Sequence, residues 1–159
     1  MKKITHILCP TDFSETADKA VAYAEQLAIE ADAQLTLVHA IETPEAWALA
    51  AQEHSRTLKL HSQLEAQLAA SSHGQQIDRF QHPGEAGEVI CWIAQDRNCD
   101  LIVMGTHGRT GLKHLLFGSV AEYVLCHARC PVVTIRDRSP DERPLERPVL
   151  MPVPAPRYM

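Results

Sequence analysis

Four glycines follow the apolar segment "DLIVM" of this chain, at positions 105, 108, 111 and 118, and Ser119 comes directly after the last of them. Glycine weakens regular structure, so such a cluster needs a backbone reason. Gly105 and Gly108 would let backbone N–H groups approach a ligand closely and could adopt positive φ. Gly118 and Ser119 stand before a helical pattern, and the free N–H groups of a helix N-terminus bind anions. The spacing therefore predicts a phosphate-binding loop.

The charges around this loop favour the same interpretation. Residues 101–121 contain no Asp or Glu, whereas His107, Arg109, Lys113 and His114 all occur there. The whole chain is acidic, with 15 Lys and Arg against 20 Asp and Glu and a net charge of −5. A cationic loop in an acidic protein suits a nucleotide phosphate chain. The overall charge argues against a protein that binds DNA or RNA along a basic face.

The glycine pattern matches neither the dinucleotide motif Gly-x-Gly-x-x-Gly nor the phosphate loop Gly-x-x-x-x-Gly-Lys-Ser/Thr. Two of the residues concerned also have purely structural interpretations. Ser119 could serve as a helix N-cap, and Asp12 with Glu15 could form a capping box at the first helix. The loop contains no Ser–His–Asp or paired-carboxylate arrangement, so we assign no catalytic residue.

Histidines and cysteines are too sparsely spaced to predict a metal site. His54 and His61 lie seven apart on a helical stripe, where core-edge positions are the commoner explanation. Cys126 and Cys130, with His127 between them, lack a second ligand pair at zinc-site spacing. We therefore assign no metal ligand.

Regular elements that could position the loop alternate along the chain. Apolar runs predict strands at 4–9, 33–40, 76–81, 100–105 and 131–136. Helical periodicity predicts helices at 14–32, 44–70, 84–98 and 119–128. The alternation predicts an α/β fold, an open, doubly wound, Rossmann-like sheet of five parallel strands with helices on both faces. Ligands of such sheets bind beyond the carboxyl ends of the strands, where the winding reverses, so "CPTDFS" and "MGTHG" would border one crevice.

The apolar stripes also predict which side chains face inward. In the helix at 84–98 these include Val89 and Ile93, and in the helix at 119–128 they include Val124 and Leu125. We expect Trp92 in the core, because large apolar side chains are usually buried.

The composition changes after Arg136, where prolines occur at 140, 144, 148, 152, 154 and 156. We divide the chain into a nucleotide-binding domain at 1–137 and a proline-rich tail at 138–159. Prolines prevent this tail from forming a helix or a central strand. The apolar residues Leu145, Val149 and Val153 favour an extended arm docked on the domain or a partner over a disordered extension.

Composition also bears on the setting in which the protein works. No apolar run reaches the roughly 18 to 20 residues of a membrane span. Five cysteines form no disulfide framework, which favours the reducing cytoplasm.

The spacing Gly105-x2-Gly108-x9-Gly118-Ser119 resembles the motif Gly-x2-Gly-x9-Gly-Ser/Thr of the universal stress protein family, in its ATP-binding branch. The likeness covers roughly residues 1–136. It extends to "CPTDFSE" at 9–15, "DLIVMGTHGRTGL" at 100–112, "LLFGSVAEYVL" at 115–125 and "CPVV" at 130–133.

The resemblance implies ATP or AMP, with or without Mg²⁺, as the bound ligand. The residues that it places along the adenosine are Pro10, Thr11, Asp12 and, against the adenine, Val38. Those that it places beneath the ribose and phosphates are Met104 and Gly105. Those around the phosphates are Gly108, Arg109, Gly118, Ser119 and Val120, and His107 beside them completes the predicted set.

The resemblance also implies a homodimer through the last strand, at Val132, Val133, Thr134 and Ile135. The expected function is a stress-response or regulatory protein that binds adenine nucleotide without designed turnover and acts through an unidentified protein partner. One alternative is a slow ATP-hydrolysing or adenylyl-transferring enzyme of related fold, although the glycine-free loop "CPTDFS" argues against it. The other is a nucleotide-free, partner-binding scaffold, although the intact glycine motif argues against that.

Overall fold

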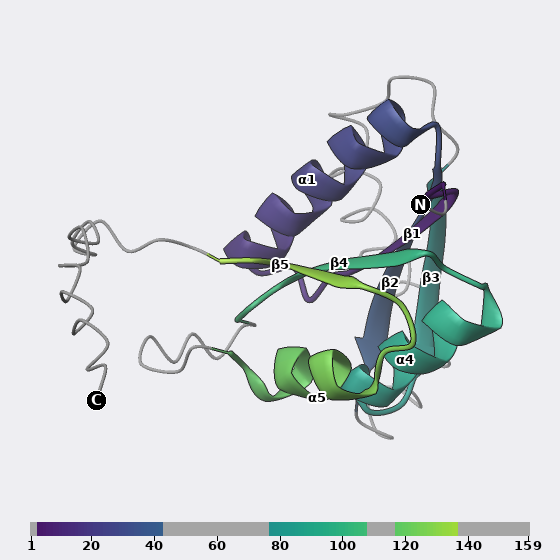
Figure 1. Cartoon of the computed structure of the whole chain (residues 1–159). Coiled ribbons are helices and arrows are strands. Elements are labelled where there is room, and N and C mark those ends of the chain that lie inside the picture. The colour runs from purple at the N-terminus through teal and green to yellow at the C-terminus, as the bar shows by residue number, and fades with distance from the viewer. Residues whose placement is uncertain (1–2, 43–76, 108–116, 137–159) are drawn as a thin grey trace, which may run out of the picture.

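The computed structural model describes residues 3–42, 77–107 and 117–136, and it shows a parallel sheet between two layers of helices (Figure 1). The strands are β1 (His6–Pro10), β2 (Gln34–Ile41), β3 (Ile77–Pro83), β4 (Leu101–Gly105) and β5 (Val132–Ile135). The helices are α1 (Glu15–Ala31), α4 (Ala86–Asp96) and α5 (Ser119–His127). The predicted α/β class and five-stranded sheet are confirmed. The helix expected at 44–70 and the tail at 138–159 lie outside the described residues.

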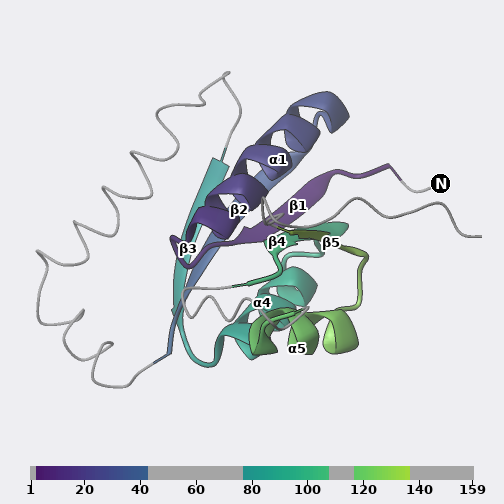
Figure 2. The ribbon, with the colours of Figure 1, turned by 90° about the vertical axis from the view of Figure 1, so that its left-hand side faces the viewer.

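The strand order is β3-β2-β1-β4-β5, and every pair is parallel. The winding reverses between β1 and β4, where Ile7 pairs with Leu101 and Leu8 with Ile102. Helix α1 covers one face of the sheet, and α4 with α5 covers the other (Figure 2). This is a doubly wound arrangement, with its switch point at the carboxyl ends of β1 and β4.

The core is split between the two faces of the sheet. Ile7 and Cys9 pack on the α1 side, whereas Leu8 between them packs against α4 and α5. All three are fully buried. A strand that is covered on both faces is apolar at successive positions, so β1 and β4 could be predicted clearly from the sequence. Among the described helices, none is long and apolar enough to cross a membrane.

The start of α1 differs from the predicted capping box. Ser14 is the N-cap, and its hydroxyl accepts a hydrogen bond from the Ala17 N–H at 3.2 Å. The Asp12 carboxylate instead accepts from the Ser14 N–H at 3.0 Å. A capping box between Asp12 and Glu15 is therefore wrong, because the turn at Asp12 moves the helix start to Glu15.

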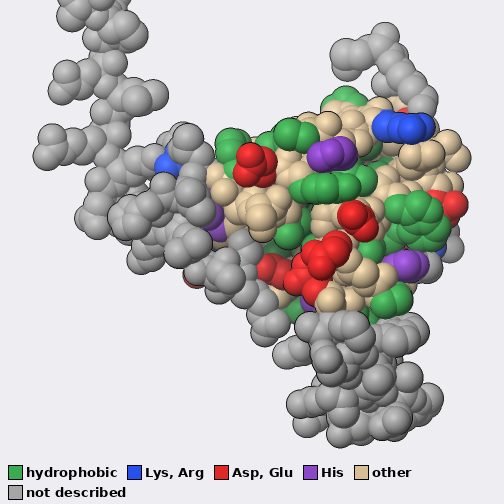
Figure 3. All heavy atoms as spheres, turned by 90° about the horizontal axis from the view of Figure 1, so that it is seen from below, with side chains coloured by type: hydrophobic (Ala, Val, Ile, Leu, Met, Phe, Trp, Pro, Cys, Tyr) green, Lys and Arg blue, Asp and Glu red, His purple; other side chains and the backbone are tan. Residues whose placement is uncertain are grey.

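Three further expectations about α4 and α5 are corrected. Leu125 is 43% exposed, and Ala121 is buried in its place. Trp92 is 51% exposed and packs its ring against His82, with 5.0 Å between ring centroids. Gly118, not Ser119, is the N-cap of α5. Figure 3, which looks onto α4 and α5, shows hydrophobic, histidine and acidic side chains mixed on this face.

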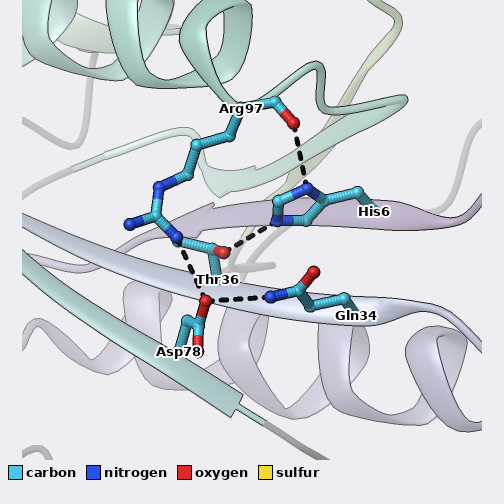
Figure 4. Close-up of polar contacts among 5 residues, drawn as sticks. All are labelled: His6, Gln34, Thr36, Asp78 and Arg97. Atoms are coloured by element: carbon cyan, nitrogen blue, oxygen red, sulfur yellow. Dashed lines mark hydrogen bonds and ion pairs between the residues drawn. The ribbon is translucent and has the colours of Figure 1, made fainter.

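A polar network joins the first three strands near their amino ends (Figure 4). Thr36 is fully buried, and its hydroxyl pairs with His6 Nε2 at 2.8 Å. His6 Nδ1 lies 3.2 Å from the Arg97 carbonyl, which can only accept, so Nδ1 carries a proton. Arg97 and Gln34 both donate to Asp78 Oδ2, at 3.1 and 2.8 Å. The network satisfies the buried threonine and fixes the end of α4 over the sheet.

Glu25 provides a stability prediction, because it is a carboxylate on the buried side of α1. It is 8% exposed, and its Oε1 has no hydrogen-bond partner among the described residues. Burial raises the pKa of the Cys9 thiol, and the charge of Glu25 adds to this effect. An unpaired buried polar atom is destabilising, so Glu25→Met is expected to raise the free energy of unfolding by about 1 to 2 kcal/mol in urea titrations. Glu30→Met, on the exposed side of α1, is the matched control, and a less stable Glu25→Met protein would contradict the prediction.

Candidate functional site

The candidate site begins where β1 and β2 end side by side. Pro10, the last residue of β1, is the register partner of Val38. The next residue, Thr11, donates its N–H to the Val38 carbonyl at 2.8 Å. The side chain of Thr11 is 4% exposed, and its hydroxyl accepts from the Phe13 N–H at 3.1 Å. The chain therefore leaves the sheet along a defined path.

The loop between β1 and α1 is held from both sides. Phe13 has a φ of 62°, a left-handed conformation that is uncommon for a bulky residue. Its ring packs on His39, with 4.8 Å between centroids, and His39 Nδ1 donates to the Thr11 carbonyl at 2.8 Å. The Asp12–Ser14 hydrogen bond closes the turn. These contacts hold Asp12 in one position at the edge of the sheet.

The second loop is organised around Thr106, which follows β4 and is 2% exposed. Its N–H donates to the carbonyl of Ile135 in β5 at 2.9 Å, and its carbonyl accepts from the Gly118 N–H at 2.7 Å. Its hydroxyl also pairs with His107 Nδ1 at 2.9 Å. One buried residue thus holds the start of α5 at the carboxyl end of β4.

This arrangement places a helix N-terminus at the switch point of the sheet. The Glu122 N–H donates to the Gly118 carbonyl at 3.0 Å. The N–H groups of Ser119, Val120 and Ala121 come before this bond, and such groups have no intrahelical acceptor. They carry the positive end of the helix dipole, so they suit a phosphate or another anion.

Gly105 has a packing role that the sequence did not predict, and it lacks the positive φ that was considered for it. Among the described glycines only Gly84 has a positive φ, so Gly105 does not use the left-handed conformation. A Cβ atom at Gly105 would lie 3.0 Å from Thr16 Cγ2 and 3.3 Å from the Thr16 carbonyl carbon. The missing side chain lets the first turn of α1 pack closely against the end of β4.

The predicted residues meet at the carboxyl edge from three directions. Pro10, Thr11 and Asp12 come from β1, whereas Met104, Gly105 and His107 come from β4. The start of α5 supplies the remaining described positions, Gly118, Ser119 and Val120. The side chains of Val38 and Met104 are 1% and 4% exposed and belong to the core. β2 also continues beyond Val38 to Ile41. Gly108 and Arg109 lie outside the described residues.

The sequence did not single out Thr106, Phe13 or His39. Thr106 acts mainly through its backbone hydrogen bonds, and Phe13 combines an uncommon φ with the packing of its ring on His39. Residue type alone reveals neither feature. His39 interrupts an apolar strand, and this was the available signal that its ring has a polar partner.

In doubly wound parallel sheets ligands bind at the switch point, and a helix N-terminus there suits an anion. The comparison with known families is more specific. The chain belongs to the universal stress protein family, whose profile it matches over residues 3–136.

Relatives support this assignment in sequence and in structure. Universal stress protein MJ0531 of Methanocaldococcus jannaschii is 30% identical over 142 residues, which cover 82% of this chain and 81% of that protein. The solved structure of MJ0577 from the same organism has a TM-score of 0.75 at 29% identity and covers 86% of this chain and 99% of its own.

Two less similar solved structures share the fold. A universal stress protein in complex with cAMP has a TM-score of 0.66 at 20% identity and covers 85% of this chain and 98% of its own. One from Archaeoglobus fulgidus in complex with dAMP has a TM-score of 0.62 at 18% identity and covers 85% of this chain and 99% of its own.

Proposed function

We propose that this chain binds ATP or AMP, as a regulatory or stress-response protein of the ATP-binding branch of its family, without designed turnover. The observation that carries the proposal is the α5 N-terminus, which the Thr106–Gly118 hydrogen bond holds beside the end of β4. Phosphates would lie on the N–H groups that begin α5. The adenosine would lie toward the ends of β1 and β2, near Asp12.

Two further observations support the adenine nucleotide. The spacing from Gly105 to Ser119 resembles the motif of the ATP-binding branch at every fixed position. Two proteins of the same fold were solved with the adenine nucleotides cAMP and dAMP. Among the described residues, no three His, Cys, Asp or Glu side chains are grouped to hold a metal. Mg²⁺, where it accompanies ATP, would be held by the phosphates.

Thermal unfolding with added nucleotides tests the proposal. A ligand that binds the native state at a hundred times its Kd stabilises it by about 2.7 kcal/mol. For a domain of this size, ATP or AMP should then raise the Tm by roughly 5 to 10 °C. GTP and inorganic phosphate are the controls. The proposal fails if no adenine nucleotide shifts the Tm, or if GTP and phosphate shift it equally.

A separate experiment tests whether the protein binds ATP without turning it over. Purified protein should retain bound ATP over hours, with release of inorganic phosphate no faster than in a protein-free control. Steady ATP cleavage or transfer of the adenylyl group would instead favour an enzyme of related fold. Purified protein that neither contains nor binds nucleotide would favour a partner-binding scaffold. We place the protein in the cytoplasm, where thiols stay reduced, with a regulatory protein partner still to be identified.

We also propose a homodimer that pairs through β5. This strand is one edge of the sheet, and its four residues are all half-buried. An open edge of branched apolar residues favours pairing with a second copy. Val133→Lys is therefore expected to convert the dimer to a monomer in light scattering at tens of micromolar (about the Kd of a weak dimer). Tyr23→Lys, which changes an exposed residue on α1, is the control and should remain dimeric. A wild-type protein that is already monomeric would contradict the proposal.

A further inference from the structure

Three cysteines from separate parts of the chain come together on the α4 and α5 side of the sheet. Cys91 lies in α4, Cys99 lies between α4 and β4, and Cys130 lies between α5 and β5. Cys99 is buried within the apolar cluster of that face, and Cys91 and Cys130 are half-buried and pack against the same cluster. We call these residues the cysteine cluster. Cys99 and Cys130 lie near the amino ends of β4 and β5, whereas the candidate nucleotide loops, at Thr11–Ser14 and from Thr106 to Gly118, lie at the carboxyl ends of the strands.

Cys99 and Cys130 precede the neighbouring parallel strands β4 and β5 and pack in the same apolar cluster. Ile102 pairs with Val132, and the Ile102 N–H donates to the Pro131 carbonyl at 3.0 Å. Extending this register by two residues sets Asp100 opposite Cys130, and Cys99 is the residue before Asp100. Cys99 belongs to the turn that ends α4, where its N–H donates to the Ala94 carbonyl at 2.8 Å. This turn lets the Cys99 side chain pack on the same face of the sheet as Cys130.

The electrostatics agree with this placement. Burial raises the pKa of the Cys99 thiol to about 12, and the neighbouring Cys130 adds to the rise. Burial also raises the pKa of Cys91, again with a contribution from Cys130. Cys130 therefore lies near both other thiols. All three are protonated near neutral pH, so they react slowly with oxidants.

We propose that Cys99 and Cys130 are a peroxide-dependent disulfide pair. Cys130, which is half-buried, attacks first: its thiolate displaces water from hydrogen peroxide and becomes a sulfenic acid. The Cys99 sulfur then attacks the Cys130 sulfur, the S–S bond forms and a second water leaves. Two thiols lose two electrons in total, and one peroxide is reduced to two waters.

The chemistry of the pair sets when the bond forms and how long it lasts. Thiols with raised pKa values form a disulfide slowly, because little thiolate is present. The same property makes them poor leaving groups, so the finished bond resists reduction. The pair should therefore stay reduced through brief exposure to peroxide and become oxidised under sustained exposure. Because the bond lies away from the nucleotide loops, oxidised protein should bind nucleotide as the reduced protein does.

Peptide mapping of the full-length protein tests the proposal. After exposure to hydrogen peroxide at pH 8.5 and alkylation of the remaining thiols, mass spectrometry should find a Cys99–Cys130 peptide. The same experiment at pH 7.5 should give about tenfold slower formation, because the thiolate fraction falls tenfold. The disulfide closes a loop of about 30 residues, so the Tm should rise by several degrees on oxidation.

Matched variants separate this pair from the other cysteines. Cys126→Ser, which removes the exposed thiol of α5, should leave the link intact, whereas Cys130→Ser and Cys99→Ser should each abolish it. Circular dichroism checks that each variant is folded. Cys99→Ser and Cys130→Ser test the pair independently, so one folded variant is sufficient. A link that runs through Cys91 or Cys126 instead, or over-oxidation of Cys130 without any link, would overturn the proposal.

Discussion

Replacing Gly118 by valine is expected to weaken ATP binding about a hundredfold or more while the domain stays folded. Gly118 has a φ of −75° and a ψ of 160°, which any residue adopts, so the backbone should accept the change. A valine side chain at the α5 N-terminus would block the approach of a phosphate to the N–H groups beyond it. Losing two charge-assisted hydrogen bonds, at about 1.5 to 3 kcal/mol each, accounts for the size of the effect.

Calorimetric titration of ATP into the two proteins measures this difference, with circular dichroism to compare their folds. Gly118→Ser is the matched control, since serine is a small and favourable N-cap residue. It should retain more affinity than Gly118→Val. If folded Gly118→Val binds ATP as tightly as the wild type, then the α5 N-terminus is not the phosphate site.

Replacing Gly105 by valine is expected to act on the fold, with a loss of about 2 to 3 kcal/mol in the free energy of unfolding. Any Cβ at this position meets the Thr16 methyl group at 3.0 Å, and the Thr16 backbone lies just behind it. The two branches of valine would force α1 away from the end of β4. Urea titration of both proteins gives the difference, and a Gly105→Val protein as stable as the wild type would contradict it.

A double-mutant cycle shows where that strain arises. Gly105→Ala should cost about 1 kcal/mol, because its single methyl group is crowded chiefly by the Thr16 methyl. Thr16→Ser removes that group, so the double variant should recover part of the loss. No recovery would mean that the Thr16 backbone, at 3.3 Å, is the group that gives way.

The sequence predicted the sheet well because its central strands are covered on both faces. Val89 and Ile93 were likewise placed correctly, since α4 buries a single stripe against a flat sheet. Leu125 and Trp92 were not, because apolar spacing alone does not show where neighbouring elements stop covering a helix. The N-cap of α1 is Ser14 because of the turn at Asp12, and Asp12 was a second candidate because its capping preference is similar.

The sequence predicted which loops form the candidate site, but it did not predict the contacts that hold these loops together. The glycine spacing pointed to Gly118 and the α5 N-terminus because a residue without a side chain leaves the neighbouring backbone N–H groups accessible. It did not indicate that the missing side chain of Gly105 lets Thr16 pack closely against the end of β4. Thr106 left no trace in the pattern, because its two main-chain hydrogen bonds could be made by almost any residue.

The two main-chain hydrogen bonds of Thr106 would couple nucleotide binding to subunit pairing. The Thr106 carbonyl accepts from the Gly118 N–H at 2.7 Å, and the Thr106 N–H donates to the Ile135 carbonyl at 2.9 Å. Thr106 therefore links the start of α5 to β5. A phosphate that draws the start of α5 outward would therefore also act on β5, the edge at which a second subunit would pair. Thermodynamic linkage makes such coupling reciprocal. If bound nucleotide raises the dimerisation constant by some factor, then dimerisation raises the affinity for nucleotide by the same factor. The protein's response to nucleotide would then depend on its own concentration.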